Sequence, residues 1–234
     1  ILLSILEHHS NLVPWQMLAQ QRGVLLRFLP MTPEGRLDLD QLDSELTERC
    51  RLVALTHCSN VTGAVTDVGR VVAAAHAVGA KVMLDGAQRV PHGPLDLREL
   101  DVDFYVFSGH KTYGPTGIGV LWGRRDLLDA MPPFMTGGQM IAEVTPTRAP
   151  FRPPPRRFEA GTPPIAAAVG LGAALDWMQA YNSDAPSCWI AGVSFGAWIA
   201  MQLLMRRPEV EGFISIAPPA NLYDFTFLAP CPSS

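Results

Sequence analysis

Phe104-Tyr105-Val106-Phe107-Ser108-Gly109-His110-Lys111-Thr112-Tyr113-Gly114-Pro115 joins an apolar run to a polar turn rich in glycine. The first four residues are aromatic or β-branched, which is typical of a buried strand. The glycines and the proline after them predict a turn rather than a helix. A lysine at such a strand end can supply the free amine that a Schiff base with an aldehyde cofactor requires. A solvated loop lysine would fit the same pattern, so the interpretation depends on the neighbouring motifs.

The same pattern, an apolar run followed at once by polar residues, recurs three times upstream. The polar segments are Glu7-His8-His9-Ser10-Asn11 after residues 1–6, Thr56-His57-Cys58-Ser59-Asn60 after residues 52–55, and Asp85-Gly86-Ala87-Gln88 after residues 80–84. Between the last two, residues 66–79 carry apolar side chains at helical spacing and end in Gly79. This spacing predicts an amphipathic helix closed by the glycine.

Strands that alternate with helices indicate an α/β fold with a mainly parallel sheet. In such sheets, ligands bind at the carboxyl ends of the strands. The polar residues located after the four strands are therefore expected to meet at one site. They are His8, Asn60, Asp85, Gln88, His110 and Lys111.

These residue types suit pyridoxal phosphate. Its pyridinium nitrogen stays protonated beside a carboxylate, for which Asp85 is the candidate. His8 offers a flat ring for stacking, Asn60 or Gln88 a donor to the phenolic oxygen, and Ser108 with His110 donors to the phosphate. Taken alone, Asp85 would equally suit a turn and His8 a hydrogen-bonded strand end.

Five motifs in one order resemble the class V aminotransferase family, specifically the cysteine desulfurases of the sulfur-mobilisation branch, which are also similar to selenocysteine lyases. The motifs lie at residues 7–15, 59–63, 85–88, 104–119 and 157–163, and the resemblance covers residues 1–181. It implies the large-domain fold of the pyridoxal phosphate-dependent aminotransferases. It also implies a homodimer, a cysteine-like substrate, a sulfur-acceptor protein and a place in sulfur metabolism such as iron–sulfur cluster assembly.

The resemblance also assigns roles residue by residue. It makes Lys111 and His8 the catalytic residues: Lys111 carries the cofactor, and His8 stacks on its ring. Asp85 becomes the pyridinium partner. Asn60 and Gln88 become contacts to the ring oxygen and the substrate, and Ser108 and His110 contacts to the phosphate. Thr162 would reach the phosphate of the neighbouring subunit.

Two family features are expected to be missing. The chain starts after the position of the family's small-residue and threonine phosphate loop. The segment after residue 181 does not match the small domain that holds the nucleophilic cysteine and the substrate-binding arginine. Cys58 lies next to Asn60, but a free cysteine at a strand end is more often a small buried hydrophobe. We therefore expect a domain that is incomplete at both ends and impaired in sulfur transfer.

Residues 187–234 resemble a fragment of another family, the α/β-hydrolases. An apolar strand, the turn Gly192-Val193-Ser194-Phe195-Gly196 and an apolar helix to about Arg207 are similar to their nucleophile elbow, and residues 211–217 predict the next strand. Residues 182–186 are the expected junction between the two pieces. In that family the acid and the histidine come after the serine, and no histidine comes after Ser194, so we expect it to be inactive.

Composition limits the classes of partner and cellular location. A formal net charge of -4 gives no reason to expect nucleic acid, and no apolar run reaches membrane-spanning length. Four unclustered cysteines without a CxxC pattern favour a reducing compartment, so we expect a cytoplasmic protein without a metal site. The sequence thus predicts a protein similar to a cysteine desulfurase. The alternatives are selenocysteine lyase or transaminase chemistry, an inactive chimera, or a serine hydrolase fragment.

Overall fold

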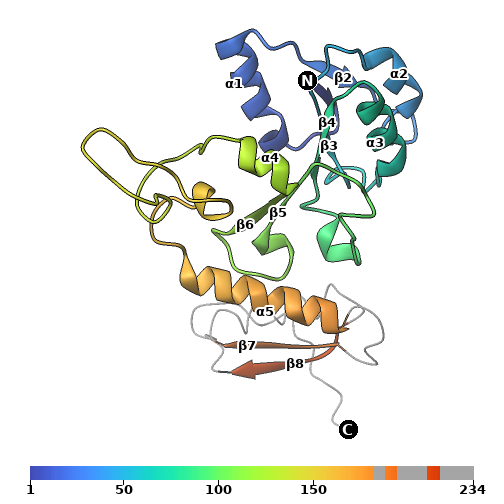
Figure 1. The fold of residues 1–234 in the computed structure, drawn as a ribbon. Coiled ribbons are helices and arrows are strands. Elements are labelled where there is room, and N and C mark those ends of the chain that lie inside the picture. The colour runs from blue at the N-terminus through green and yellow to red at the C-terminus, as the bar shows by residue number, and fades with distance from the viewer. Residues whose placement is uncertain (182–187, 194–209, 217–234) are drawn as a thin grey trace. The chain divides into compact units, whose positions relative to one another are not determined.

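The computed structural model describes residues 1–181, 188–193 and 210–216 (Figure 1). The chain divides into two compact units, Ile1–Ala180 and Tyr181–Ser234, and each is described by itself.

A six-stranded sheet organises the first unit. Its strands are β1 (Leu2–Ser4), β2 (Arg27–Leu29), β3 (Leu52–Thr56), β4 (Lys81–Asp85), β5 (Phe104–Ser108) and β6 (Gly119–Gly123), in the order β2-β1-β3-β4-β5-β6. All neighbours pair in parallel except β5 and β6, which are antiparallel. The mainly parallel α/β sheet predicted from the sequence is therefore confirmed.

Helices cover both faces of this sheet. They are α1 (Val13–Arg22), α2 (Leu42–Glu45), α3 (Val68–Ala77), α4 (Arg125–Ala130) and α5 (Ile165–Tyr181), with 3-10 turns η1 (His9–Asn11), η2 (Leu39–Gln41), η3 (Val90–His92), η4 (Gly109–Lys111) and η5 (Arg156–Phe158). Figure 1 shows α2 and α3 on one side of the sheet and α1 on the other. The parallel strands β1, β3 and β4 are consequently mainly buried between two layers.

The core lies between α3 and the sheet. Asp67 caps α3 by accepting the N–H of Arg70 at 3.2 Å, and Gly79 ends the turn with a φ of 76°. The helix predicted over residues 66–79 is thus present and begins at Val68. Its buried face packs in one cluster with buried strand residues. The helix contributes Val68, Val71, Val72 and Ala75, and the strands contribute Val53, Leu55, Val82, Leu84 and Tyr105.

Strand register decides which side chains share a face. Leu55 pairs with Leu84, and Leu84 pairs with Tyr105. Because successive side chains alternate, the next row, Thr56, Asp85 and Val106, points to the opposite face. Asp85 therefore lies on the face away from the α3 core.

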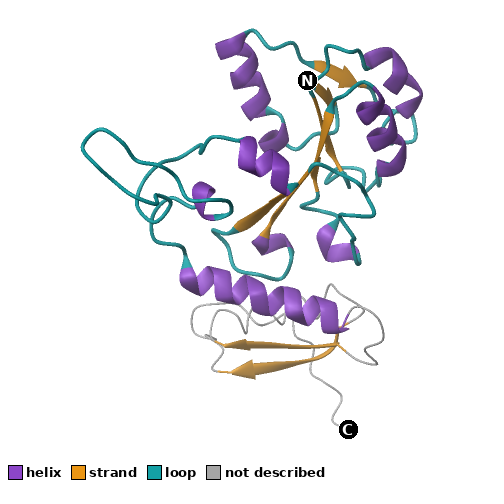
Figure 2. Ribbon diagram, viewed as in Figure 1, coloured by secondary structure: helices purple, strands orange, loops and turns teal. Residues whose placement is uncertain are grey.

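The first unit also contains a long segment with little regular structure. Figure 2 shows the loops between α4 and α5, interrupted by η5. Met140 is fully buried there, whereas Phe134 is 96% exposed.

The second unit is described in two strands, β7 (Cys188–Val193) and β8 (Val210–Ile216), which pair in parallel. Strands were predicted at both positions. Gly192 and Val193, the first two residues of the predicted turn, belong to β7, whereas Ser194, the rest of that turn and the predicted helix to Arg207 lie outside the described residues. Within the ranges described above, no helix is long and apolar enough to cross a membrane.

Candidate active site

The carboxyl ends of β1, β3, β4 and β5 lie side by side, because these four parallel strands are neighbours in the sheet. The segments after them carry the residues singled out from the sequence. His8 follows β1, Asn60 follows β3, Asp85 ends β4, and Lys111 follows β5 on η4. The edge therefore gathers aromatic, amide, carboxylate and amine groups that are far apart along the chain.

The turn that carries Lys111 is tightly packed. The Gly109 carbonyl accepts the backbone N–H groups of Thr112 at 2.9 Å and Gly114 at 3.0 Å, and the Thr112 hydroxyl at 2.8 Å. A Cβ on Gly109 would come within 2.9 Å of the Ile118 side chain, and Thr112 is fully buried. The glycine is thus required for the turn to close, and the backbone at Lys111 is fixed from both sides.

Helix α5 supports the same turn. A Cβ on Gly114 would approach Leu171 of α5 to 2.9 Å, and one on Gly170 would meet Pro115 at 3.3 Å. Tyr113 also contacts Trp177 edge to face, with ring centroids 5.6 Å apart. The side chains of Ser108 and Lys111 are half-buried, and His110 is exposed.

The Asp85 carboxylate is buried and held at its backbone. Its carbonyl accepts the N–H of His57 at 2.9 Å, and the next residue, Gly86, donates its N–H to Val106 at 2.8 Å. Oδ1 accepts the N–H of Ala87 at 2.9 Å. Among the described residues no other side-chain or backbone group donates a hydrogen bond to this carboxylate, so Oδ2 is the oxygen available to a ligand.

His8 lies at the start of η1, and its side chain is exposed. Its Nδ1 lies 2.8 Å from the Ser10 hydroxyl, and its ring centroid lies 5.9 Å from that of His9. A ring fixed at one edge by Ser10 has an open face, which suits stacking on a flat ligand.

Glu7, which the sequence analysis did not single out, fixes the η1 turn that carries His8. Its Oε1 accepts the Ser4 hydroxyl at 2.5 Å and the Thr56 N–H at 3.0 Å, and its Oε2 accepts the Asn11 amide at 2.6 Å. Burial raises the pKa of Glu7 despite these hydrogen bonds. The carboxyl therefore ties the end of β1 and η1 to the end of β3.

The remaining predicted residues occupy more open positions. Asn60 is exposed in the turn after β3, Gln88 is half-buried after β4, and Thr162 is exposed ahead of α5. Cys58 is buried, with Sγ 3.6 Å from the Gly63 carbonyl oxygen. A small buried side chain was expected there.

A buried pair on the other face of the sheet was also missed. His57 Nδ1 lies 2.9 Å from the Tyr105 hydroxyl, and the two rings meet edge to face. Burial, with a smaller contribution from Arg89, lowers the pKa of His57 to about 4, while burial raises that of Tyr105. Both groups are therefore neutral at pH 7. The pair could not be predicted from the sequence pattern, because Tyr105 lies in an apolar run and looks like an ordinary buried strand residue.

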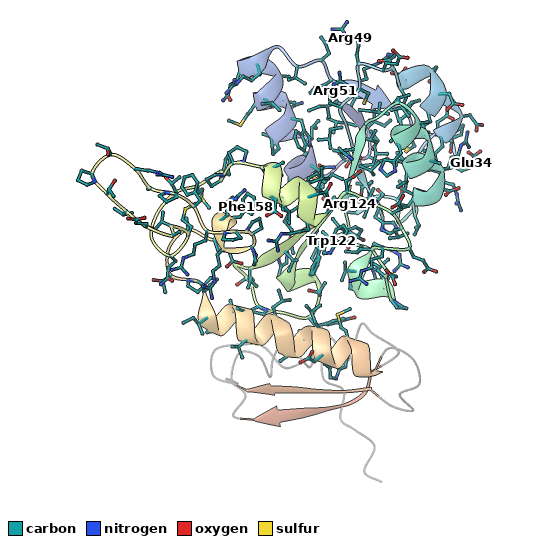
Figure 3. The ribbon with its side chains drawn as sticks, in the orientation of Figure 1. Glu34, Arg49, Arg51, Trp122, Arg124 and Phe158 are labelled. Carbon is teal, nitrogen blue, oxygen red and sulfur yellow. The ribbon has the colours of Figure 1, made fainter. Side chains whose placement is uncertain are left out.

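The opposite edge of the sheet holds a charged cluster around Asp103. This side chain is 1% exposed and lies 2.8 Å from His76 Nε2, 3.2 Å from Lys81 Nζ and 3.6 Å from Arg124 Nε. Arg124 follows β6 and lies close to Trp122 (Figure 3). Burial opposes ionisation of Asp103, but hydrogen bonds from His76 and Val82 together with the positive charge of Lys81 outweigh it and lower its pKa.

Two cavities lie away from the candidate site. One of about 230 Å³ is lined by the Asp103 cluster, and a mainly apolar one of about 670 Å³ lies among Trp15, Leu18, Leu25 and Leu52. Across the described ranges, no three histidine, cysteine, aspartate or glutamate side chains are grouped to hold a metal ion.

Sequence comparison agrees with the motifs. The model of the aminotransferase class-V family matches residues 1–191. The cysteine desulfurase of Dickeya dadantii is 55% identical over 186 residues, which are 79% of this chain and 45% of that protein. The cysteine desulfurase CsdA of Escherichia coli is 45% identical over 213 residues, 91% of this chain and 52% of its own length. The chain thus spans about half the length of these curated relatives.

Comparison with solved structures also finds similarity to a cysteine desulfurase. The crystal structure of Escherichia coli CsdA superposes with a TM-score of 0.75 at 48% identity, over 77% of this chain and 45% of that one. A variant of C-DES with glycine covalently linked to its pyridoxal phosphate cofactor gives a TM-score of 0.69 at 30% identity, over 76% and 49%. The chain shares its fold with these proteins, and it belongs to the class-V aminotransferase family.

Proposed function

We propose that this chain binds pyridoxal phosphate through Lys111 and acts on a cysteine-like amino acid. The observation that carries the proposal is the placement of Lys111 on a rigid turn after β5, next in the sheet to β4 with its buried Asp85. The names of the relatives, cysteine desulfurases, support the substrate class. The pyridoxal phosphate in the C-DES structure supports the proposal that this chain binds the same cofactor.

The residues at this edge fit the chemistry of the cofactor. When bound, pyridoxal phosphate supplies an aldehyde for a lysine amine and a ring that withdraws electrons from the substrate. Asp85 Oδ2 can accept the pyridinium N–H, because Oδ1 already accepts the N–H of Ala87. In this proposal Lys111 Nζ holds the cofactor and, once released by the substrate, moves a proton.

The other contacts complete the proposed site. His8 stacks on the ring, and Asn60 and Gln88 contact the ring oxygen and the substrate. Ser108 and His110 bind the phosphate, and Thr162 binds the phosphate in the neighbouring subunit of a homodimer. A protein thiolate would attack the sulfur of the substrate, so that the C–S bond breaks, alanine is left and a persulfide forms, and a sulfur-acceptor protein would take the sulfur from that persulfide. Selenocysteine or another amino acid is the competing substrate for the same site.

The test uses the fact that the chain has two lysines, Lys81 and Lys111. The purified chain with pyridoxal phosphate should gain a visible absorption band, and borohydride should fix the cofactor to Lys111. Lys111→Ala should lose the band and the label. Lys81→Arg, which keeps the positive charge beside Asp103, is the matched control and should keep both. Label on Lys81, or no label, would contradict the proposal.

Release of alanine from cysteine, compared with selenocysteine and with an oxo-acid acceptor, then separates the desulfurase from the lyase and the transaminase. For residues 187–234 we propose that Ser194 does not act as a nucleophile, because no histidine comes after it in the sequence.

A further inference from the structure

We propose that His57 and Tyr105 are positioning residues that hold the Asp85 carboxylate from the opposite face of the sheet. This inference rests on the proposed function for the meaning of Asp85, but the geometry that carries it is independent of any cofactor.

The first observation is how closely Tyr105 approaches the Asp85 turn. A Cβ built on Gly86 would lie 2.2 Å from the Tyr105 hydroxyl oxygen and 2.1 Å from the ring carbon Cε1. The tyrosine ring therefore lies directly against the Gly86 backbone. It fills the space under the residue that comes after Asp85.

The second observation is what holds the tyrosine in place. Its hydroxyl lies 2.9 Å from His57 Nδ1, and both side chains are buried. His57 also donates its backbone N–H to the Asp85 carbonyl at 2.9 Å. His57 thus contacts both Tyr105, through its side chain, and the Asp85 turn, through its backbone N–H.

The third observation is the path from the turn to the carboxylate. The Gly86 N–H donates to Val106, and the Ala87 N–H donates to Asp85 Oδ1 at 2.9 Å. Ala87 directly follows Gly86, so the Tyr105 ring that lies against Gly86 also constrains where the Ala87 N–H points. In this proposal the pair fixes the direction in which Oδ2 points by way of the backbone of Gly86 and Ala87.

The test variants use this geometry. Tyr105→Phe removes the hydroxyl and keeps the ring. His57→Leu removes the ring nitrogens, whereas in His57→Asn an amide group takes a position close to that of Nδ1 and should restore the hydrogen bond in part. Val72→Ala, a core truncation on α3 away from the turn, is the control for a general loss of stability.

The first arm measures amide hydrogen exchange by NMR in the chain without cofactor. Tyr105→Phe and His57→Leu should raise exchange at Gly86 and Ala87 by roughly tenfold more than Val72→Ala does, and His57→Asn by less. Exchange at these two amides that merely matches the control would overturn the proposal.

The second arm titrates pyridoxal phosphate and follows the visible band with pH. We expect Tyr105→Phe to weaken cofactor binding several-fold and to shift the pH midpoint of the band, with the control unchanged. An unshifted midpoint alongside faster exchange would also overturn the proposal, because the carboxylate would then be positioned without the pair. If the wild-type chain binds no cofactor, the proposed function fails, and the first arm still decides whether the pair holds the Asp85 turn.

Discussion

Glu7 Oε1 accepts the backbone N–H of Thr56 at 3.0 Å, a hydrogen bond between residues 49 apart in the sequence. The same carboxylate binds Ser4 and Asn11, so one buried side chain fixes the ends of two neighbouring strands and the turn that carries His8.

Glu7→Gln should destabilise the chain by about 1–3 kcal/mol. The amide keeps the shape, but its NH₂ group must face the Asn11 amide or the Thr56 N–H, which are both donors. Urea unfolding at pH 7 followed by circular dichroism measures the loss. Glu34→Gln, at an exposed position, is the control and should unfold like the wild type.

Stability should fall as pH drops from about 6.5 toward 4. The unfolded chain protonates His57 near pH 6.5, whereas in the folded chain burial lowers its pKa to about 4. Stability from the neutral ring is therefore complete above pH 6.5 and is lost as pH falls through the folded pKa. Unfolding free energies at pH 7 and pH 5 should converge in His57→Asn, while His92→Asn keeps the wild-type difference. If the unfolding free energy changed equally between pH 7 and pH 5 in both variants, His57 would be excluded as the cause of the pH dependence.

Asp103→Asn should cost about 1–3 kcal/mol, because a neutral amide weakens the hydrogen bonds that the buried carboxylate accepts from His76 and the Val82 N–H, and it removes the partner charge of half-exposed Lys81. Asp101→Asn removes a carboxylate from the same cluster at a position that is 61% exposed, and it should cost less than about 1 kcal/mol. Guanidinium unfolding of both variants tests the contrast. Similar losses would mean that burial does not set the contribution of Asp103.

Gly86→Ala should be among the most disruptive single-methyl changes in the chain. Its Cβ would overlap the Tyr105 ring, which is itself fully buried and cannot move aside freely. Gly172→Ala adds the same methyl on α5, where no atom of the described residues, apart from the backbone of the helix itself and the two chain neighbours, lies within 4 Å. That control should be neutral or stabilising by up to about 1 kcal/mol. Thermal unfolding of the two variants gives the comparison, and a wild-type melting temperature for Gly86→Ala would contradict the close contact.

A fluorophosphonate probe should leave Ser194 unlabelled. A serine hydroxyl is barely ionised near neutral pH, and no histidine comes after Ser194 in the sequence to activate it. Labelling is read by intact-mass spectrometry, with Ser194→Ala as the control. Stoichiometric labelling that disappears in Ser194→Ala would make the second unit an active hydrolase.

The sheet and the position of the site were predictable because each of four apolar runs ends in polar residues. Leu52–Thr56 and Phe104–Ser108 carry β-branched or aromatic side chains that suit a strand buried on both faces. The helix α1 was missed although Pro14 stands near its start and Gly23 ends it with a φ of 66°. A proline in the first turn and a glycine after the last turn are the sequence features that would have predicted α1.

The supporting residues could not be predicted in the same way. Glu7 and Tyr105 act through partners 49 and 48 residues away, and sequence spacing does not reveal contacts over that separation. Strand β6 was likewise missed, because its glycines at both ends weaken the strand pattern of Gly119–Gly123. These residues become visible once the register of β3, β4 and β5 is known.

The separation along the chain of the segments at this edge also has a kinetic consequence. Contacts between residues about 50 positions apart form late in folding, after the loops between them have closed. No short piece of the chain carries the edge in finished form. Any ligand bound there recognises only the native state, so it must raise the melting temperature as its concentration increases.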